Sequence, residues 1–184
     1  MDEQAKNILL DIARKSIEAA VNKKPIPPIS TDHPDLQGKQ GAFVTLKTHG
    51  RLRGCIGRLV SDIPLYRLIS EMAVSSATED FRFEFNRIKP SELNDLEIEI
   101  SVLSTLKPVQ DPLDFELGKH GILVQKGAHT GCFLPQVASE TGWSKEEFLS
   151  HCCSGKAGLS AHAWKHTGIT IYTFTAEIIQ EKRR

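Results

Sequence analysis

Residues 42–57, AFVTLKTHGRLRGCIG, contain two runs of β-forming residues that flank the dipeptide His49-Gly50. Glycine adopts the positive φ that a tight two-residue turn requires. The stretch therefore predicts an antiparallel hairpin, with one strand ending before His49 and the other beginning after Gly50.

Two amphipathic helices are expected around this hairpin. The first ends before residues 23–41, where four prolines remove backbone donors and favour a long surface loop. The second can be capped by Ser61 or Asp62, and Pro64 suits its first turn. In both segments apolar residues recur at helical spacing. They are Ile8, Leu9, Ile12, Ala13, Ile17, Ala20 and Val21 in the first helix, and Leu65, Leu68, Ile69, Met72, Ala73 and Ala77 in the second.

The rest of the chain predicts mostly short strands. LEIEISVLS, residues 96–104, alternates apolar and polar residues as a half-buried strand does. GILVQKG (121–127) and TGCFLP (130–135) indicate a shorter hairpin, and ITIYTFTAEII (169–179) indicates a final strand. WSKEEFLSHCC (143–153) indicates a helix capped by Ser144 with Glu147 three residues later. This order predicts an α+β fold with a mainly antiparallel sheet.

Length, charge and cysteine content limit the class of protein. The 184 residues suffice for one domain or two closely joined lobes, and 23 basic residues balance 23 acidic ones, so net charge indicates neither nucleic acid nor an anionic membrane as partner. No run of about 18 apolar residues occurs, and acidic residues precede the first apolar segment. Four cysteines, two of them adjacent, suit reduced thiols. A cytoplasmic protein is expected.

Three short motifs resemble those of the AMMECR domain family. They are LRGCIG at 52–57, FLPQVA at 133–138, and KAGL at 156–159 followed by Trp164. One departure is Phe81 in DFRF (80–83), where the family pattern has proline. The resemblance spans nearly the whole chain. It implies the stand-alone prokaryotic form, which is associated with a Memo-like protein and a radical S-adenosylmethionine protein in a three-component system.

The resemblance also implies an architecture. It predicts a larger subdomain, about 1–106 and 168–184, with a five-stranded antiparallel sheet, and a smaller one, about 107–167, with three strands. A cleft between them is expected to bind a substrate, peptide or partner protein; no reaction and no cofactor are implied. The expected binding residues are Leu52, Arg53, Gly54, Cys55, Ile56, Gly57, Asp80, Arg82, Pro135 and Gln136.

Within LRGCIG, strand alternation places Arg53, Cys55 and Gly57 on one face, and Leu52, Gly54 and Ile56 on the other. A guanidinium beside a thiol favours the thiolate, which is the nucleophile and the metal ligand. Cys55 is thus a candidate nucleophile with Arg53 as its electrostatic partner. The alternative is that Cys55 is a small core residue and the glycines mark a bulge or the packing of the lobes.

Other clusters of polar residues give weaker indications of a functional site. His129, Cys132, His151, Cys152 and Cys153 lack the spacing of a zinc site, so no metal is expected. Glu97 and Glu99 fit a solvent-facing strand surface, and the basic clusters near 47–58 and at 182–184 fit solvated faces. The sequence leaves open a cleft-binding protein of a multi-protein system, a non-catalytic adaptor that binds a peptide or protein, and a Cys55-dependent enzyme.

Overall fold

The computed structural model describes residues 1–181; the basic tail, 182–184, lies outside the described residues. By their internal contacts the residues form two compact units. The larger unit contains Met1–Leu103 and the segment from Glu177 onward, and the smaller unit contains Ser104–Ala176. Each combines helices with an antiparallel sheet, so the predicted α+β class is confirmed. Among the described helices, none has the length and apolarity needed to cross a membrane.

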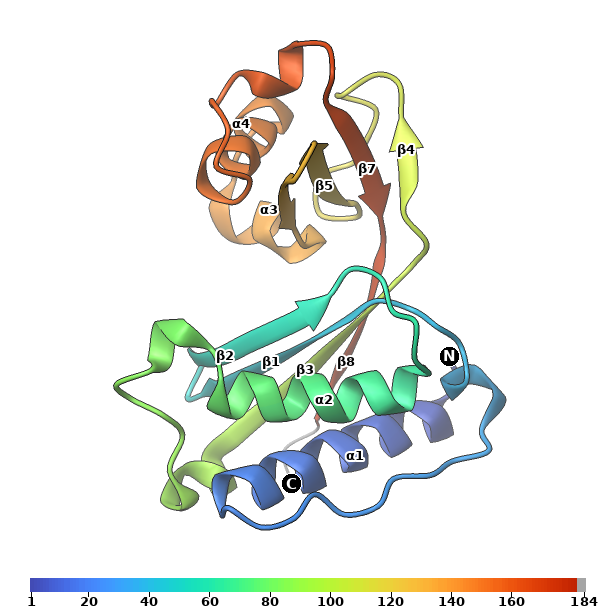
Figure 1. Cartoon of the computed structure of the whole chain (residues 1–184), viewed down its shortest axis with the longest axis vertical. Coiled ribbons are helices and arrows are strands. Elements are labelled where there is room, and N and C mark those ends of the chain that lie inside the picture. The colour runs from blue at the N-terminus through green and yellow to red at the C-terminus, as the bar shows by residue number, and fades with distance from the viewer. Residues whose placement is uncertain (182–184) are drawn as a thin grey trace. The chain divides into compact units, whose positions relative to one another are not determined.

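The larger unit is a four-stranded sheet covered by two helices. Figure 1 shows both helices on the same side of the sheet, and they contact each other and the strands. The sheet order is β2-β1-β3-β8. The elements are α1 (Glu3–Val21), η1 (Pro34–Leu36), β1 (Ala42–Thr48), β2 (Arg51–Arg58), α2 (Leu65–Thr78), η2 (Phe81–Phe83), η3 (Pro90–Asp95), β3 (Leu96–Leu103) and β8 (Ala176–Gln180).

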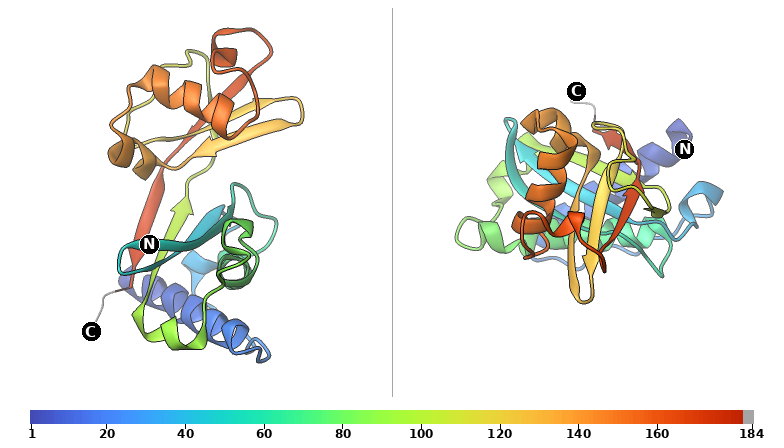
Figure 2. Two further views of the ribbon diagram at one scale, coloured as in Figure 1. Left: turned by 90° about the vertical axis from the view of Figure 1, so that its left-hand side faces the viewer. Right: turned by 90° about the horizontal axis from the view of Figure 1, so that it is seen from above.

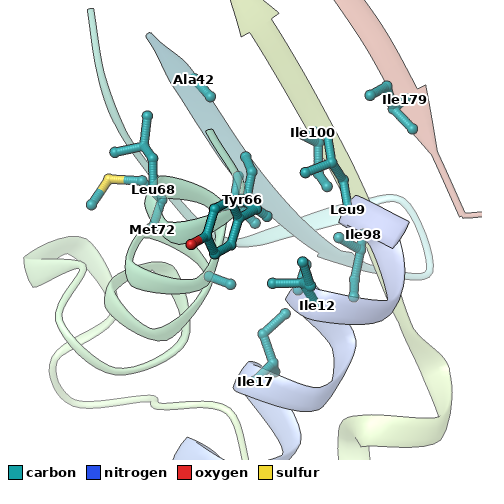
Figure 3. Close-up of a cluster of buried hydrophobic side chains, with 14 of the residues drawn as sticks. Leu9, Ile12, Ile17, Ala42, Tyr66, Leu68, Met72, Ile98, Ile100 and Ile179 are labelled. Atoms are coloured by element: carbon teal, nitrogen blue, oxygen red, sulfur yellow. The ribbon is translucent and has the colours of Figure 1, made fainter. Parts of the chain in front are cut away.

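One apolar core lies between this sheet and its helices (Figure 3). Leu9, Ile12 and Ile17 of α1 lie near Leu68 of α2 and Ile98 of β3 in the same cluster. The predicted alternation of β3 is confirmed from Leu96 to Ile100, but Ser101, expected on the polar face, is also buried. Removal of this apolar surface from water is the main driving force for the unit's folding.

The predicted hairpin is present. β1 and β2 are antiparallel, and the turn between them has φ 51° at His49 and φ 73° at Gly50. Positive φ at both turn positions is the geometry that matches the right-handed twist of the flanking strands. The register then shifts by one: Lys47 lies opposite Leu52, but Leu46 lies opposite Gly54. Arg53 is therefore the extra residue of a β-bulge.

The smaller unit packs short helices on a second four-stranded sheet, in the order β4-β7-β5-β6 (Figure 2). Its core gathers aromatic rings of the sheet and helices, including Phe133, Phe148 and Trp164. The predicted cap is confirmed, since Ser144 and Glu147 form a capping box. The elements are β4 (Lys107–Val109), β5 (Gly121–Lys126), β6 (His129–Phe133), α3 (Pro135–Thr141), α4 (Lys145–Gly155), η4 (Ala163–Lys165) and β7 (Thr170–Phe174).

Each unit has four strands, whereas five and three were predicted. The smaller unit has one more than predicted because the expected final strand is two strands. β7 pairs with β4 and β5 in the smaller unit, whereas β8 lies beside β3 in the larger one. The interruption is at Thr175, whose N–H and C=O both bond to Ser104. The chain thus crosses between units at 103/104 and 176/177, rather than near 106/107 and 167/168.

Candidate functional site

The bulge at Arg53 changes which side chains of β2 share a face. Directly opposed residues in a sheet lie on the same face. Lys47, Thr45 and Phe43 are two residues apart along β1 and therefore share one face. Their partners are Leu52, Cys55 and Gly57. The predicted placement of Leu52 with Gly54 and Ile56 is therefore wrong, because the bulge inserts one residue into the alternation.

The Arg53 side chain is held by groups other than Cys55. Its Nε donates to Oε1 of Glu92 at 3.2 Å, and its Nη2 donates to Oε2 at 3.2 Å, a bidentate pair. Nη1 donates to the carbonyl oxygen of Asn86 at 3.1 Å. Burial alone would raise the pKa of Glu92, but hydrogen bonds from the Lys89 amide and Arg53 outweigh it and lower that pKa below 4.5. Arg53 thus fixes the segment after η2 to the hairpin.

Cys55 lies beside Thr45 on the neighbouring strand, with Sγ and Oγ1 3.2 Å apart. Burial raises the pKa of the Cys55 thiol above its ordinary 9.0, against the opposing effects of the Thr45 hydroxyl and the Arg82 charge. The cation that opposes this rise is Arg82, whereas Arg53, which was predicted to lower the pKa, is paired with Glu92. The thiol form, which is neither a strong nucleophile nor a metal ligand, is favoured at neutral pH.

Asp80 and Arg82 bind the backbone of Cys55. The Asp80 carboxylate accepts from the Cys55 N–H at 2.9 Å, and Nη2 of Arg82 donates to the Cys55 carbonyl at 3.2 Å. The two side chains also pair, with Arg82 Nη2 and Asp80 Oδ2 2.6 Å apart. Burial alone would raise the pKa of Asp80, which is 1% exposed, but these hydrogen bonds lower it below 3.8. Two side chains of the DFRF motif thus hydrogen-bond to the main chain of the LRGCIG motif.

The two glycines of LRGCIG, Gly54 and Gly57, allow other parts of the chain to pack closely on both faces of β2. A Cβ at Gly54 would lie 2.0 Å from the carbonyl oxygen of Ser76, so α2 can approach β2 only because Gly54 has none. A Cβ at Gly57 would meet the ring of Phe43 at 2.2 Å. Of the roles predicted for the glycines, the bulge is confirmed, since it lies at Arg53 next to Gly54, whereas these close contacts were not predicted.

A pocket of about 670 Å³ lies at the hairpin end of β2. Figure 1 shows the tip of the β1–β2 hairpin and the segment that follows α2 at this same end of the sheet. Arg51 is exposed and makes no ion pair with any residue of 1–181. The pocket-lining residues are Thr48, His49, Arg51, Leu52, Arg53, Phe83, Asn86 and Glu92.

The hydrophobic side chains of DFRF and its continuation are largely in solvent. Phe81 is 80% exposed and Phe85 is 100% exposed, while Phe83 is half-buried between the guanidinium groups of Arg53 and Arg82, each 5.8 Å from its ring centre. Two large hydrophobic side chains are thus exposed within five residues of one another, a feature found at interaction sites.

The structure brings some predicted residues together and separates others. Leu52–Gly57, Asp80 and Arg82 form one constellation in the larger unit. Pro135 and Gln136 belong to the smaller unit, where they open the first turn of α3. Sequence reasoning missed Glu92; the only local signal was its place three residues after Lys89, as in a capping box.

One group of potential metal ligands lies at the start of α1, where none was predicted from the sequence. Within residues 1–181, the one group of three potential ligands whose donor atoms lie within 4.8 Å of one another is Asp2, His33 and Asp35. Asp2 caps α1 by accepting from Ala5 N at 2.8 Å, and it pairs with Nε2 of His33 at 3.2 Å. These contacts give the group a structural role at the start of α1.

Comparisons with known proteins agree with the motifs. The family model AMMECR1 matches residues 10–179. A protein of Thermococcus onnurineus is 40% identical over 185 residues, covering 95% of this chain and 89% of that protein. Protein MK0488 of Methanopyrus kandleri is 41% identical over 186 residues, covering 95% and 87%.

A solved structure supports the same relationship. The crystal structure of the uncharacterized protein PH0010 from Pyrococcus horikoshii resembles this fold with a TM-score of 0.89 and 35% sequence identity. The match covers 99% of this chain and 94% of that one. The family model, the relatives and the fold agree over nearly the full length, and the chain belongs to the AMMECR1 family.

Proposed function

We propose that this chain is a binding component that docks a partner protein on its larger unit. The docking area, here called the β2–η2 surface, comprises Leu52, Arg82, Phe81, Phe83 and Phe85. The observation that carries the proposal is the exposure of Phe81 and Phe85, at 80% and 100%, beside the fixed Asp80–Arg82 pair. Aromatic and arginine side chains are the residues that most often dominate binding energy at protein interfaces.

The rigidity of this segment supports docking. Asp80 caps η2 by accepting from the Arg82 N–H at 3.2 Å, and Arg87 donates to the Asp80 carbonyl at 2.6 Å. Rings held on an ordered backbone lose less conformational entropy on binding than rings on a disordered loop. The segment 80–87 therefore presents Phe81 and Phe85 in a defined arrangement.

The chemistry of Cys55 favours binding over catalysis. A thiol with a raised pKa, whose neighbour Arg53 is paired with Glu92, lacks the activation that nucleophilic cysteines have. The polar backbone groups of Cys55 are occupied by Asp80 and Arg82. We assign Cys55 a structural place at the centre of the constellation.

The family resemblance suggests the partners to test first, a Memo-like protein and a radical S-adenosylmethionine protein. Their affinity for the full chain is measured by calorimetry or biolayer interferometry, with the double variant Phe81→Ser/Phe85→Ser. We expect binding of at least one partner, and a loss of about tenfold or more in the double variant, as for hot-spot aromatics.

Val60→Ser is the matched control. Val60 is also an exposed apolar residue, at 68%, but it follows the opposite end of β2. Its substitution should leave the affinity unchanged. Equal affinities of wild type and the double serine variant for a partner that binds would contradict the proposed surface.

A further inference from the structure

The turn end of β2 carries an open pair of main-chain groups at the free edge of the sheet. β2 is the first strand of its sheet, so no strand of residues 1–181 lies on its other side. Thr48 and Arg51 flank the two-residue turn and form a hydrogen-bonded pair, so the next pair, Lys47 and Leu52, is a non-hydrogen-bonded pair. The N–H and C=O of Leu52 therefore point away from β1, to the free edge, and Leu52 takes part in none of the turn, loop or side-chain hydrogen bonds found within residues 1–181.

Three residues later, side chains occupy the main-chain groups at the same edge of β2. The N–H and C=O of Cys55 also point outward, and the side chains of Asp80 and Arg82 engage both. An extended segment that pairs with β2 can therefore hydrogen-bond at Leu52 but cannot continue past Cys55. This limits the pairing to a short segment, and it leaves Asp80 and Arg82 undisturbed.

The pocket beside Leu52 has room for such a segment. Its volume of about 670 Å³ lies within the roughly 300–1,000 Å³ that ligand pockets span. Its other wall is formed by Phe83, Asn86 and Glu92, which come from the segment after α2. An inserted strand would thus contact β2 on one side and an aromatic ring on the other.

The charge of the pocket selects the occupant. Arg53 and Glu92 neutralise each other through their bidentate pair. Arg51 remains as an exposed guanidinium with no ion pair in the described chain. Uncompensated positive charge beside open backbone groups favours a segment that carries a carboxylate.

We infer that the edge of β2 at Leu52 binds a short, extended, acidic segment of a partner protein by strand addition. The N–H and C=O of Leu52 pair with the main chain of that segment, and Arg51 pairs with one of its carboxylates. This inference rests on the proposed function, since it names the chemistry of the partner that the β2–η2 surface receives.

The probe is a library of random ten-residue peptides displayed on phage and selected on the full chain. Enriched sequences should combine β-forming residues with at least one Asp or Glu. A synthetic copy of the strongest binder should slow hydrogen exchange of the Leu52 amide at least about tenfold, because that amide becomes hydrogen-bonded. Enrichment of basic sequences would overturn the inference, as would the same enriched sequences from a selection on the Arg51→Glu variant. Protection from exchange confined to other parts of the chain would also overturn it.

Two kinds of variant distinguish the contribution of charge to peptide binding from that of main-chain hydrogen bonds. Arg51→Glu, or lysine in place of the acidic residue of the peptide, should weaken binding about tenfold or more. Leu52→Pro removes the N–H at an edge position that tolerates proline, and should also abolish binding, whereas Leu52→Ala should retain it in part. If Leu52→Pro fails to fold, peptides methylated on single backbone nitrogens test the same hydrogen bonds, and full affinity of every methylated peptide would refute strand addition.

The same variants separate this inference from the proposed function. A partner protein that loses affinity with Phe81→Ser/Phe85→Ser but not with Arg51→Glu or Leu52→Pro uses the β2–η2 surface without strand addition, so only the inference fails. If none of these variants weakens a partner that binds the full chain, both the surface and the strand addition are wrong.

Discussion

The carboxylate of Asp80 accepts a hydrogen bond from the backbone N–H of Cys55 at 2.9 Å, across 25 positions of the sequence. Arg82 completes the contact by donating to the Cys55 carbonyl. A neighbouring strand would satisfy the same two groups, so this pair of side chains takes the place of a strand at the edge of β2. LRGCIG and DFRF, which are separate motifs in the sequence, are one structural unit.

Asp80→Ala should destabilise the larger unit. The substitution leaves the Cys55 N–H and the Arg82 guanidinium without their shared acceptor, which costs about 1–3 kcal/mol for an unsatisfied buried group. Urea unfolding followed by circular dichroism measures the loss. Glu84→Ala, at an exposed neighbouring position, is the control and should stay within about 0.5 kcal/mol of wild type. An Asp80→Ala protein as stable as that control would contradict the role given to Asp80.

Stability should fall in acid, and part of the fall should come from Asp80. Its pKa in the folded chain lies below the ordinary 3.8, so the unfolded chain binds its proton first. The stabilisation is therefore complete above about pH 4 and is lost as the pH drops toward the lower folded-state pKa. Urea midpoints between pH 2.5 and pH 6 should show this fall, and Asp80→Asn should flatten it. A wild-type midpoint that rises on acidification would contradict the prediction.

The sequence predicted the elements better than their register. The two-residue turn at His49-Gly50 would place Thr45 opposite Gly54 in a regular hairpin, but the bulge at Arg53 places it opposite Cys55. The glycines of LRGCIG indicated a bulge as one alternative, but the local sequence does not give the position of the shift. It accompanies the pairing of Arg53 with Glu92, 39 residues later, and only the folded chain brings those two residues together.

The final strand was predictable as β structure but not as two strands. Its alternation of side chains continues through Thr175, and the interruption there depends on hydrogen bonds with Ser104, 71 residues earlier. The predicted site had the same limit. Asp80 was identified through a motif, whereas its contact with the Cys55 backbone, and the raised pKa of Cys55, follow from tertiary packing.

Cys55 should alkylate slowly at neutral pH. Because burial raises its pKa above 9.0, the iodoacetamide rate should climb only at more alkaline pH, as read from the mass of the Cys55 peptide after short labelling pulses. Arg53→Ala should not raise the pKa further, since Arg53 is engaged by Glu92. A rate profile with a pKa below about 8.5, lost in Arg53→Ala, would restore the nucleophile hypothesis.

Phe81→Pro should be tolerated, and should stabilise the chain by up to about 1 kcal/mol. Phe81 is the first residue of η2, its N–H has no hydrogen-bond partner in the described chain, and Asp80 before it has the extended φ −62°, ψ 108° that a following proline requires. Phe83→Pro is the contrasting variant, because it deletes the 3.0 Å hydrogen bond from its N–H to Asp80. Thermal melts should rank Phe81→Pro at or above wild type and Phe83→Pro below it; the reverse order would refute this account of η2.

Gly54→Ala should be among the most damaging single-methyl additions in the larger unit. The new Cβ would stand 2.0 Å from the main-chain oxygen of Ser76, and a backbone atom inside a packed helix cannot move aside as a flexible side chain can. Separating α2 from β2 to make room costs roughly 1–3 kcal/mol or more. The matched control is Gly155→Ala, where a Cβ would meet nothing within 4 Å and α4 should gain up to about 1 kcal/mol. Chemical denaturation should therefore move the two midpoints in opposite directions, and an unchanged midpoint for Gly54→Ala would mean that α2 does not approach the LRGCIG strand as closely as described here.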